Sequence, residues 1–367
     1  MDEIFDVAIV GASLSGASAA ISLGQAGIRT ALIDKAHFPR RKPCGEGLSS
    51  YGLKQLELLG IKDSILNLPH VGYSGYRVRS GSVQTAFRSP WGESITIQRS
   101  ILDEAVLANA LAFSSVTGFF AKAVTNISGS TVEFENSTLR ARQIIIASGG
   151  NSPLLRKIGC KVTQHGPLRA GVTATFKGEF SAPPEAINII LKKGFEIYCT
   201  PLAQGRLNLS ILAPANTPLN LREVLLSPEV IAEAFTENSF NGVLELIPEG
   251  RVNIGNVRRS TELSSLILAG DAKEEFDPIG GMGMSHALCS GISAAKQAIR
   301  NLSATTQFNG SINSEEKELK QSASAMRLFT RICSGTFESA KKYPVALQVA
   351  NSQLASALLK TLTRELI

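Results

Sequence analysis

The stretch that decides the fold is residues 5–34, FDVAIVGASLSGASAAISLGQAGIRTALID. The apolar run 5–10 predicts a short buried strand, and residues 30–34 predict a second one. Between them, the small side chains of 17–27 predict a helix that packs closely against its surroundings. Strand, helix and strand in this order form a βαβ unit, which is the start of an open α/β sheet.

The turn between the first strand and the helix carries Gly11 and Gly16, and Ser13 replaces the middle glycine of the usual pattern. Gly11 allows the tight turn, and the helix start offers backbone N–H groups to a pyrophosphate. Asp34 ends the second strand, where a carboxylate accepts from ribose hydroxyls. We therefore expect a dinucleotide site; the alternative is a turn without a nucleotide. The residues assigned to this site are Gly11, Ser13, Leu14, Ser15, Gly16, Asp34 and Lys35.

A second glycine-rich turn lies three-quarters along the chain. The apolar run 266–269 leads into Gly270-Asp271, and residues 278–284, PIGGMGM, open a helix. A glycine-rich helix start is suited to stabilising an anion. A loop that only caps a helix would explain the glycines, but not the Gly-Asp pair at a strand end.

These segments resemble the family that contains p-hydroxybenzoate hydroxylase, the geranylgeranyl reductases and the flavin halogenases. The resemblance covers most of residues 1–310 and implies FAD as the cofactor. It implies that Asp271 binds the ribityl chain and that the amides of 280–284 face the N1/O2 edge of the flavin. The residues assigned to the cofactor on this basis are Gly270, Asp271, Pro278, Gly280, Gly281, Met282, Gly283 and Met284.

Two further segments match the same family. Arg99 is similar to an arginine that the family places beside the phosphate or ribityl chain; the alternative is a solvated surface arginine. Gly149 belongs to a segment similar to Ala-Asp-Gly-x-x-Ser-x-x-Arg, in which Ser148 replaces the aspartate. In the hydroxylases that aspartate helps to organise NAD(P)H binding. NADPH or NADH and a separate reductase therefore both stay open as electron donors.

The loop 42–48, KPCGEGL, resembles a loop near flavin and substrate in the geranylgeranyl reductase branch. It adds Arg41, Cys44 and Gly45 to the cofactor assignment. Cys44 is also the candidate catalytic residue, because three cations precede it and an electropositive setting favours the thiolate. A small packing side chain is an equally open interpretation.

Composition excludes several classes of protein. Five scattered cysteines without ligand spacing indicate a reducing compartment and no zinc site, so no metal is expected. The acidic N-terminus is unlike a secretory signal, and no apolar window reaches about 18 residues. We expect a cytoplasmic protein. A net charge of +6 suits an anionic ligand, but no basic run interleaved with aromatics indicates nucleic acid.

The length of 367 residues indicates two domains. The predicted fold class is α/β, with a Rossmann-like FAD-binding domain of the glutathione-reductase type interleaved with a mixed β-sheet substrate domain. The first domain is assigned to 1–71, 98–165 and 262–310, the second to 72–97 and 166–261, and C-terminal helices to 311–367.

The last of these segments carries an apolar stripe of Val345, Val349, Leu354 and Leu358. We expect it to dock on the core of the protein or on a dimer partner. Attachment to a membrane surface is possible for such a stripe but less favoured.

The leading functional prediction is an FAD-dependent monooxygenase that hydroxylates or epoxidises an apolar or aromatic small molecule. The alternative is a reductase of geranylgeranyl reductase type, in which FADH2 reduces a carbon–carbon double bond; the 44–47 loop and Ser148 favour it. A third alternative is a flavin-binding protein without catalysis. Residues 194–202 lack the tryptophans of the halogenase signature, which argues against halogenation.

Overall fold

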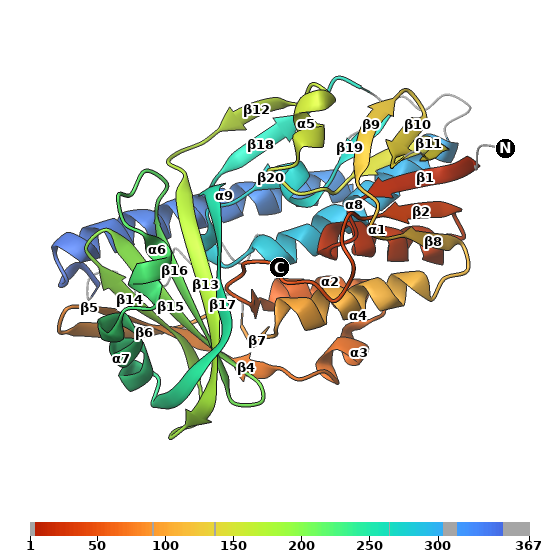
Figure 1. Ribbon diagram of the computed structural model, residues 1–367. Helices are drawn as coiled ribbons and strands as arrows, with labels where there is room; N and C mark the ends of the chain where they lie inside the picture. The colour runs from red at the N-terminus through yellow and green to blue at the C-terminus, as the bar shows by residue number, and fades with distance from the viewer. Residues whose placement is uncertain (1–3, 90–91, 136, 264, 304–313, 348–367) are drawn as a thin grey trace.

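Two large sheets lie side by side, and one long helix, α9 (Ser314–Lys342), runs behind the second sheet and reaches the helices of the first (Figure 1). The structure is a computed structural model that describes residues 4–89, 92–135, 137–263, 265–303 and 314–347. Each sheet has an apolar core on both of its faces, and a cavity lies between the two sheets.

The first sheet is parallel and is extended by an antiparallel pair of strands. Its order is β8-β2-β1-β11, with β19 parallel to the end of β11 and with β10 and β9 antiparallel at its start. These strands are β1 (Ile4–Val10), β2 (Thr30–Ile33), β8 (Val116–Phe119), β9 (Val124–Ser128), β10 (Thr131–Phe134), β11 (Ser137–Ile146) and β19 (Leu266–Leu268).

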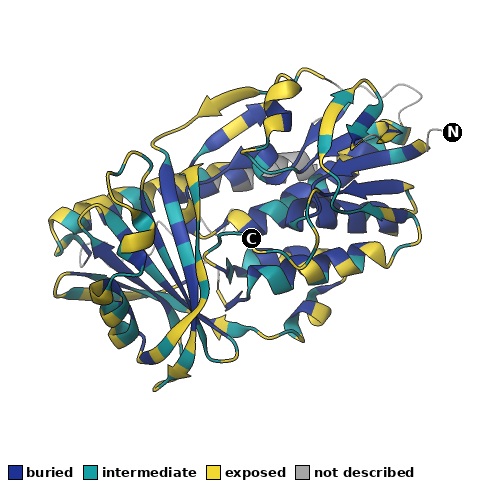
Figure 2. Cartoon of the chain, in the orientation of Figure 1, coloured by how far each residue is buried: buried dark blue, intermediate teal, exposed yellow. Residues whose placement is uncertain are grey.

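Strand β1 is apolar throughout because both of its faces are covered. Val7 and Ile9 belong to a core shared with helices α1 (Leu14–Gln25), α4 (Arg99–Leu111) and α8 (Gly283–Ser303). Ala8 and Val10 belong to a second core on the other face, which includes residues of α5 (Pro153–Lys157). Figure 2 shows β1 as buried along most of its length. A strand buried on both faces reads as a continuous apolar run.

Small side chains let α1 and α8 approach closely. A Cβ added to Gly291 of α8 would collide with the Ser15 carbonyl oxygen of α1. Ser18 of α1 donates to the Leu288 carbonyl oxygen of α8 at 3.2 Å. The small residues of 17–27 therefore serve helix packing directly beneath the Gly11 turn.

The second sheet has the order β17-β13-β16-β15-β14-β5-β6, in which only the β14–β5 pair is parallel. Ile190 of β14 packs under α6 and α7, whereas Ile189 and Leu191 face α9. The elements are β5 (Gly75–Ser80), β6 (Val83–Arg88), β13 (Arg169–Phe180), β14 (Ala186–Lys192), β15 (Phe195–Leu202), β16 (Arg206–Pro214), β17 (Phe240–Ile254), α6 (Leu221–Leu225), α7 (Pro228–Glu237) and α9 (Ser314–Lys342).

Short elements connect the two sheets. One three-stranded sheet joins β3, β7 and β4, and another joins β12, β18 and β20. Their bounds, and those of the remaining helices, are β3 (Gly47–Leu48), α2 (Ser50–Leu58), α3 (Lys62–Leu66), β4 (Val71–Tyr73), β7 (Ser94–Thr96), β12 (Lys161–Gln164), β18 (Val257–Ser260), η1 (Gly270–Ala272), β20 (Glu274–Glu275) and η2 (Pro278–Gly280).

The architecture confirms the predicted fold class of a Rossmann-like α/β domain interleaved with a mixed sheet. All strands of the second sheet lie within the ranges 72–97 and 166–261. Of the C-terminal stripe, Val345 is exposed, and Val349, Leu354 and Leu358 lie outside the described residues. None of the helices in the described ranges combines the length and apolar character that a membrane span requires.

A buried ionic cluster ties the second sheet to the first domain and to α9. Arg169 of β13 donates to Asp277 at 2.8 Å and to Glu196 of β15 at 3.0 Å. Lys341 of α9 donates to Glu196 at 2.6 Å, and Asp277 directly precedes η2. The cluster therefore fixes the 278–284 turn relative to the second sheet.

We expect Arg169→Ala to lower the free energy of unfolding by about 3–5 kcal/mol, because it leaves two buried carboxylates with one fewer cation. Urea unfolding of the purified variant measures this loss. The control is Arg77→Ala, which removes an exposed ion pair with Glu185 and should cost about 0–1 kcal/mol. Equal stability of the two variants would contradict the role of the cluster.

Candidate functional site

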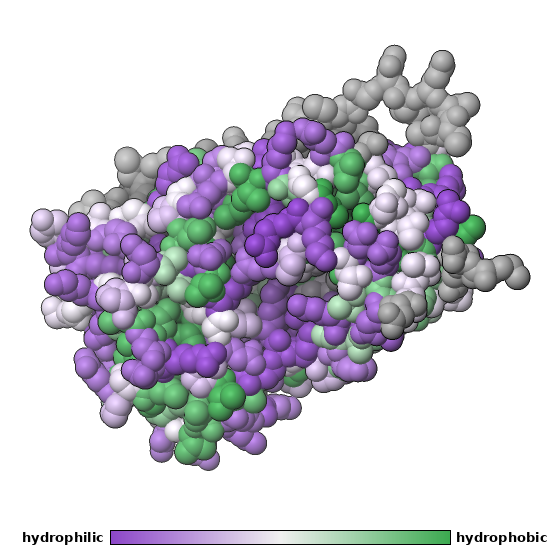
Figure 3. All heavy atoms as spheres, turned by 45° about the horizontal axis from the view of Figure 1, so that its top comes forward, coloured by the Kyte–Doolittle hydropathy of each residue, from purple (hydrophilic) through white to green (hydrophobic). Residues whose placement is uncertain are grey.

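A cavity of about 790 Å³ lies where the carboxyl ends of the parallel strands meet the inner face of the second sheet. Figure 3 shows a hollow in the middle of one face, with hydrophilic side chains around it. In open α/β sheets, ligands bind outside the carboxyl ends of the strands. The cavity therefore lies where the topology favours a ligand.

The turn after β1 forms one wall of the cavity. Gly11 has φ +106°, and an added Cβ would collide with the Ala147 carbonyl oxygen at the end of β11. A Cβ at Gly16 would collide with the Gly11 carbonyl oxygen. Only glycine fits at both positions. Because the turn carries no side chain there, it does not cover the start of α1, which stays open to the cavity.

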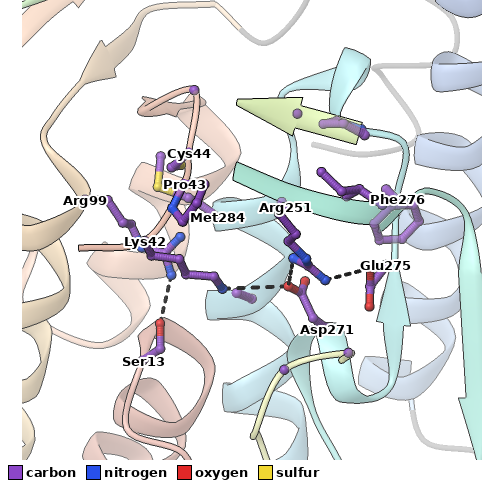
Figure 4. Close-up of a pocket in the computed structure, with 18 of the residues that line it drawn as sticks. Ser13, Lys42, Pro43, Cys44, Arg99, Arg251, Asp271, Glu275, Phe276 and Met284 are labelled. Carbon is purple, nitrogen blue, oxygen red and sulfur yellow. Dashed lines mark hydrogen bonds and ion pairs between the residues drawn. The ribbon is translucent and has the colours of Figure 1, made fainter. Parts of the chain in front are cut away.

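Ser13, which replaces the middle glycine, is part of a polar link to α4. Its Oγ accepts from Arg99 Nη2 at 2.8 Å and donates to Asp103 Oδ2 at 3.0 Å (Figure 4). Arg99 Nε donates to Asp103 Oδ1 at 2.7 Å. Arg99 is thus a buried cation in the cavity wall beside the start of α1, and the alternative of a solvated surface arginine is wrong.

Asp34 lies at the end of β2 in the same wall. Its Oδ2 accepts from the Ala12 N–H at 2.7 Å and its Oδ1 from the Ala36 N–H at 2.9 Å. These two bonds hold the carboxylate in place, and each oxygen can still accept a further hydrogen bond. The geometry is compatible with the expected contact to ribose hydroxyls.

Asp271 lies in a cluster of alternating charge (Figure 4). Its Oδ2 is 3.1 Å from Arg251 Nη1 and 3.7 Å from Lys42 Nζ, and Arg251 Nη2 is 2.9 Å from Glu275 Oε2. Burial alone would raise the pKa of Asp271, but Lys42 and Arg251 lower it to about 2. Asp271 is therefore an ionised acceptor at neutral pH.

The second glycine-rich turn borders the cavity with bare backbone. Asp277 accepts from the Ile279 N–H at 3.1 Å, and Gly281 adopts the left-handed region at φ +64°. A Cβ added to Gly45, Gly149 or Gly283 would meet nothing within 4 Å. At these three positions the backbone therefore borders open space, where a ligand can approach it closely.

Five buried polar atoms in the cavity wall have no hydrogen-bond partner among the described residues. Buried polar groups in folded proteins are almost always paired, so this group of atoms indicates a missing ligand or solvent. The atoms are Ser15 Oγ, Arg40 Nε, Glu46 Oε2, Ser148 Oγ and Tyr198 Oη.

Most of the residues assigned from the sequence converge on this cavity. They come from the first turn, the end of β2, the loop at 44–45, α4, the segment after β11, η1 and the second turn. Those in the wall are Gly11, Ser13, Ser15, Asp34, Lys35, Cys44, Gly45, Arg99, Gly149, Asp271, Pro278, Gly280, Gly281, Gly283 and Met284.

Five assigned residues lie elsewhere. Leu14 and Met282 are buried in apolar cores, and Gly16 lies beneath the Gly11 turn. Gly270 donates its N–H to Ser290. Arg41 turns outward and donates to the Ile247 carbonyl oxygen of β17 at 2.8 Å.

Cys44 lies in the wall, and its Sγ accepts from the Glu46 N–H at 3.3 Å. A chemical role for its thiol stays a prediction. Glu46, Arg251 and Tyr198 also line the wall and were not among the residues predicted from the sequence. Glu46 could have been suspected as an acid between two glycines, whereas no local pattern marks the other two.

The two glycine-bearing turns share one cavity with an ionised acid, a buried arginine and exposed amides, which together fit a flavin dinucleotide. A sequence profile of the FAD binding domain matches residues 5–306. The chain belongs to the FAD-binding domain family. It is an FAD-dependent oxidoreductase, and Asp34, Arg99 and Asp271 are the residues that would hold the cofactor.

Curated relatives cover most of the chain. A menaquinone reductase of Mycobacterium tuberculosis is 26% identical over 315 residues, 81% of this chain and 77% of that protein. A digeranylgeranylglycerophospholipid reductase of Thermoplasma volcanium is 24% identical and covers 84% of this chain and 82% of that protein.

Solved structures share the fold. A flavoprotein/dehydrogenase from Cytophaga hutchinsonii has a TM-score of 0.78 at 21% identity, over 92% of this chain and 88% of that chain. A flavin-dependent brominase has a TM-score of 0.78 at 18% identity, over 98% and 93% of the two chains.

We expect Asp271→Ala to weaken FAD binding by about 1.5–3 kcal/mol, because a hydrogen bond to a charged acceptor contributes that much. Asp271→Asn, which keeps an acceptor without charge, should have an intermediate effect. Titration of flavin-free protein with FAD, followed by flavin fluorescence, measures the change. Glu249→Ala, which removes an acid paired with Arg41 outside the cavity, is the control. Full FAD affinity in Asp271→Ala would rule out the assigned contact.

Proposed function

We propose that this protein is an FAD-dependent reductase that adds two hydrogens across a carbon–carbon double bond of an apolar, isoprenoid-type substrate. The observation that carries the proposal is the apolar chamber that continues from the cofactor wall. FAD would supply the redox chemistry, and the chain would bind the substrate, orient it and exclude water.

The chamber lies between the inner face of the second sheet and α9. Ile187 and Ile189 of β14 share one apolar core with Ile279 of the second turn and Phe337 of α9. Tyr76 stacks on Phe87 with ring centroids 5.5 Å apart. All of these side chains border the cavity. Such a lining favours a hydrocarbon chain over a polar metabolite.

The curated relatives support reduction. Both proteins described above are named as reductases, one of a menaquinone and the other of a digeranylgeranyl lipid, and each match spans about four fifths of this chain. Ser148 in place of the aspartate of the hydroxylases favours the same choice. The electron donor, whether NADPH, NADH or a separate reductase, stays open.

Oxygenation is the second candidate. The aromatic side chains Tyr73, Tyr76 and Phe87 border the chamber and could enclose an aromatic ring. The prediction of a monooxygenase therefore remains, and oxygen dependence separates it from the reductase.

The test is a single turnover without oxygen. We expect dithionite-reduced holoprotein, freed of excess dithionite, to be reoxidised by geranylgeraniol, and the product to have gained two hydrogens per reduced bond by mass spectrometry. The visible absorbance of oxidised flavin follows the reaction. No reoxidation without oxygen, combined with an oxygenated product in air, would overturn the proposal in favour of a monooxygenase. Flavin that no donor reduces would favour a binding protein.

Truncation of the chamber wall should affect the substrate and not the cofactor. We expect Phe87→Ala to raise the apparent KM for geranylgeraniol about tenfold or more, since burying a phenylalanine side chain contributes about 1.5–3 kcal/mol. Phe180→Ala, in the core beneath α7 on the opposite face of the sheet, is the control. An unchanged KM in Phe87→Ala would place the substrate elsewhere.

A further inference from the structure

Glu46 has a backbone conformation that its side chain disfavours. Its φ is +60°, in the left-handed region, and it stands between Gly45 and Gly47. A glycine would adopt this conformation without strain. Strained non-glycine residues persist where the surrounding structure holds them, and they gather at functional sites. The carboxyl group at this position therefore needs an explanation.

The carboxyl group is buried in the cavity wall. Glu46 is 8% exposed, and its Oε1 accepts from the Arg99 N–H at 3.5 Å, the outer limit of a hydrogen bond. Its Oε2 has no partner among the described residues. A buried carboxyl oxygen without a partner is costly unless the group is protonated or a ligand contacts it.

Glu46 lies at the junction of the two halves of the cavity. Arg99 on one side belongs to the cofactor wall. On the other side, a Cβ at Gly47 would lie 3.3 Å from Tyr73 Oη and 3.6 Å from Ile187 Cδ1, which are parts of the apolar chamber. A group at this junction can face both a cofactor and an apolar substrate.

The surroundings favour a carboxyl group that holds a proton near neutral pH. Burial raises the pKa of Glu46 to about 7, although Arg99 and Asn208 oppose the rise. The charged and polar groups that surround it are Arg99 of α4, Asn208 of β16, Cys44 of its own loop and, by its charge alone, Arg41. The cations among them are too few to keep Glu46 fully ionised.

We propose that Glu46 is the catalytic acid of this site and gives the proton that completes reduction of the substrate double bond. The inference rests on the proposed reductase function. Bound reduced FAD would supply the hydride and its two electrons to one carbon of the π bond and would itself become oxidised. The Glu46 carboxyl group would give its proton to the other carbon, and the resulting carboxylate would regain a proton from solvent.

A structural alternative is that Glu46 serves only to accept a hydrogen bond from the backbone N–H of Arg99, the first residue of α4. Glu46→Gln keeps that acceptor and the shape of the side chain but removes the acidic proton. We expect it to bind FAD like the parent and to slow anaerobic reoxidation by geranylgeraniol roughly 10²–10⁴-fold, the range of general acid catalysis. The parent rate should fall as pH rises through 7, and the variant should lack this dependence.

A second readout needs no turnover. A carboxyl group whose pKa is raised on folding stabilises the folded state at low pH, and this stabilisation is lost as pH rises through the folded pKa. The melting temperature of the flavin-free parent should therefore fall more than that of Glu46→Gln between pH values below and above 7. Glu104→Gln, an exposed acid on α4, is the control and should match the parent.

Glu46→Gly tests the strain directly. Its melting temperature should be no lower than that of the parent, because glycine adopts φ +60° without strain. Its reduced flavin should nevertheless be reoxidised by geranylgeraniol as slowly as that of Glu46→Gln. If Glu46→Gln reduced geranylgeraniol at the parent rate with the parent pH profile, the proposal would be overturned. A melting temperature of Glu46→Gly below that of the parent would then show that Glu46 serves to cap α4. A parent that fails to reduce geranylgeraniol at all would instead refute the reductase function, and the acid role with it.

Discussion

Strands β1 and β11 end so close together that the chain can leave β1 and enter α1 only through a residue without a side chain. The Ala147 carbonyl oxygen occupies the space that a Cβ of Gly11 would need. This contact brings the start of α1 to the carboxyl edge of the sheet, where its free N–H groups face the cavity. Arg99 and Ser13 are then positioned from α4 and α1 around the same edge.

The second half of the site depends on ion pairs between distant segments. Asp271 belongs to the first domain, Arg251 to the second sheet and Lys42 to the loop between them. Arg169 links the second sheet to Asp277 in a similar way. The cofactor wall is therefore assembled from both domains, and the relative position of the sheets is part of the binding site. Such an arrangement gives the apolar chamber a fixed place beside the cofactor.

The βαβ unit of the first domain could be predicted from the sequence because its signals are local. A continuous apolar strand, a glycine turn and an acid at the next strand end lie within thirty residues, and each has a direct physical meaning. Arg251 and Tyr198 were missed, because their roles depend on which side chains of the second sheet face the cavity. Arg41 was assigned to the cofactor with the 42–48 loop, but it donates to β17, and its contact with the cofactor stays a prediction. The local signals that bear on whether the flavin reduces a substrate or activates oxygen are the 44–47 loop and Ser148, and both favour reduction.

The outward turn of Arg41 has a consequence for solubility. β17 is the last strand of its sheet, and Val243 and Ile247 on it are exposed. An uncovered edge with apolar side chains is a template for intermolecular strand pairing and aggregation. Arg41 occupies one of the edge carbonyls and pairs with Glu249 beside it, so a bulky charge blocks the approach of another strand. The loop that carries Cys44 and Glu46 thus also covers part of the exposed edge of the second sheet.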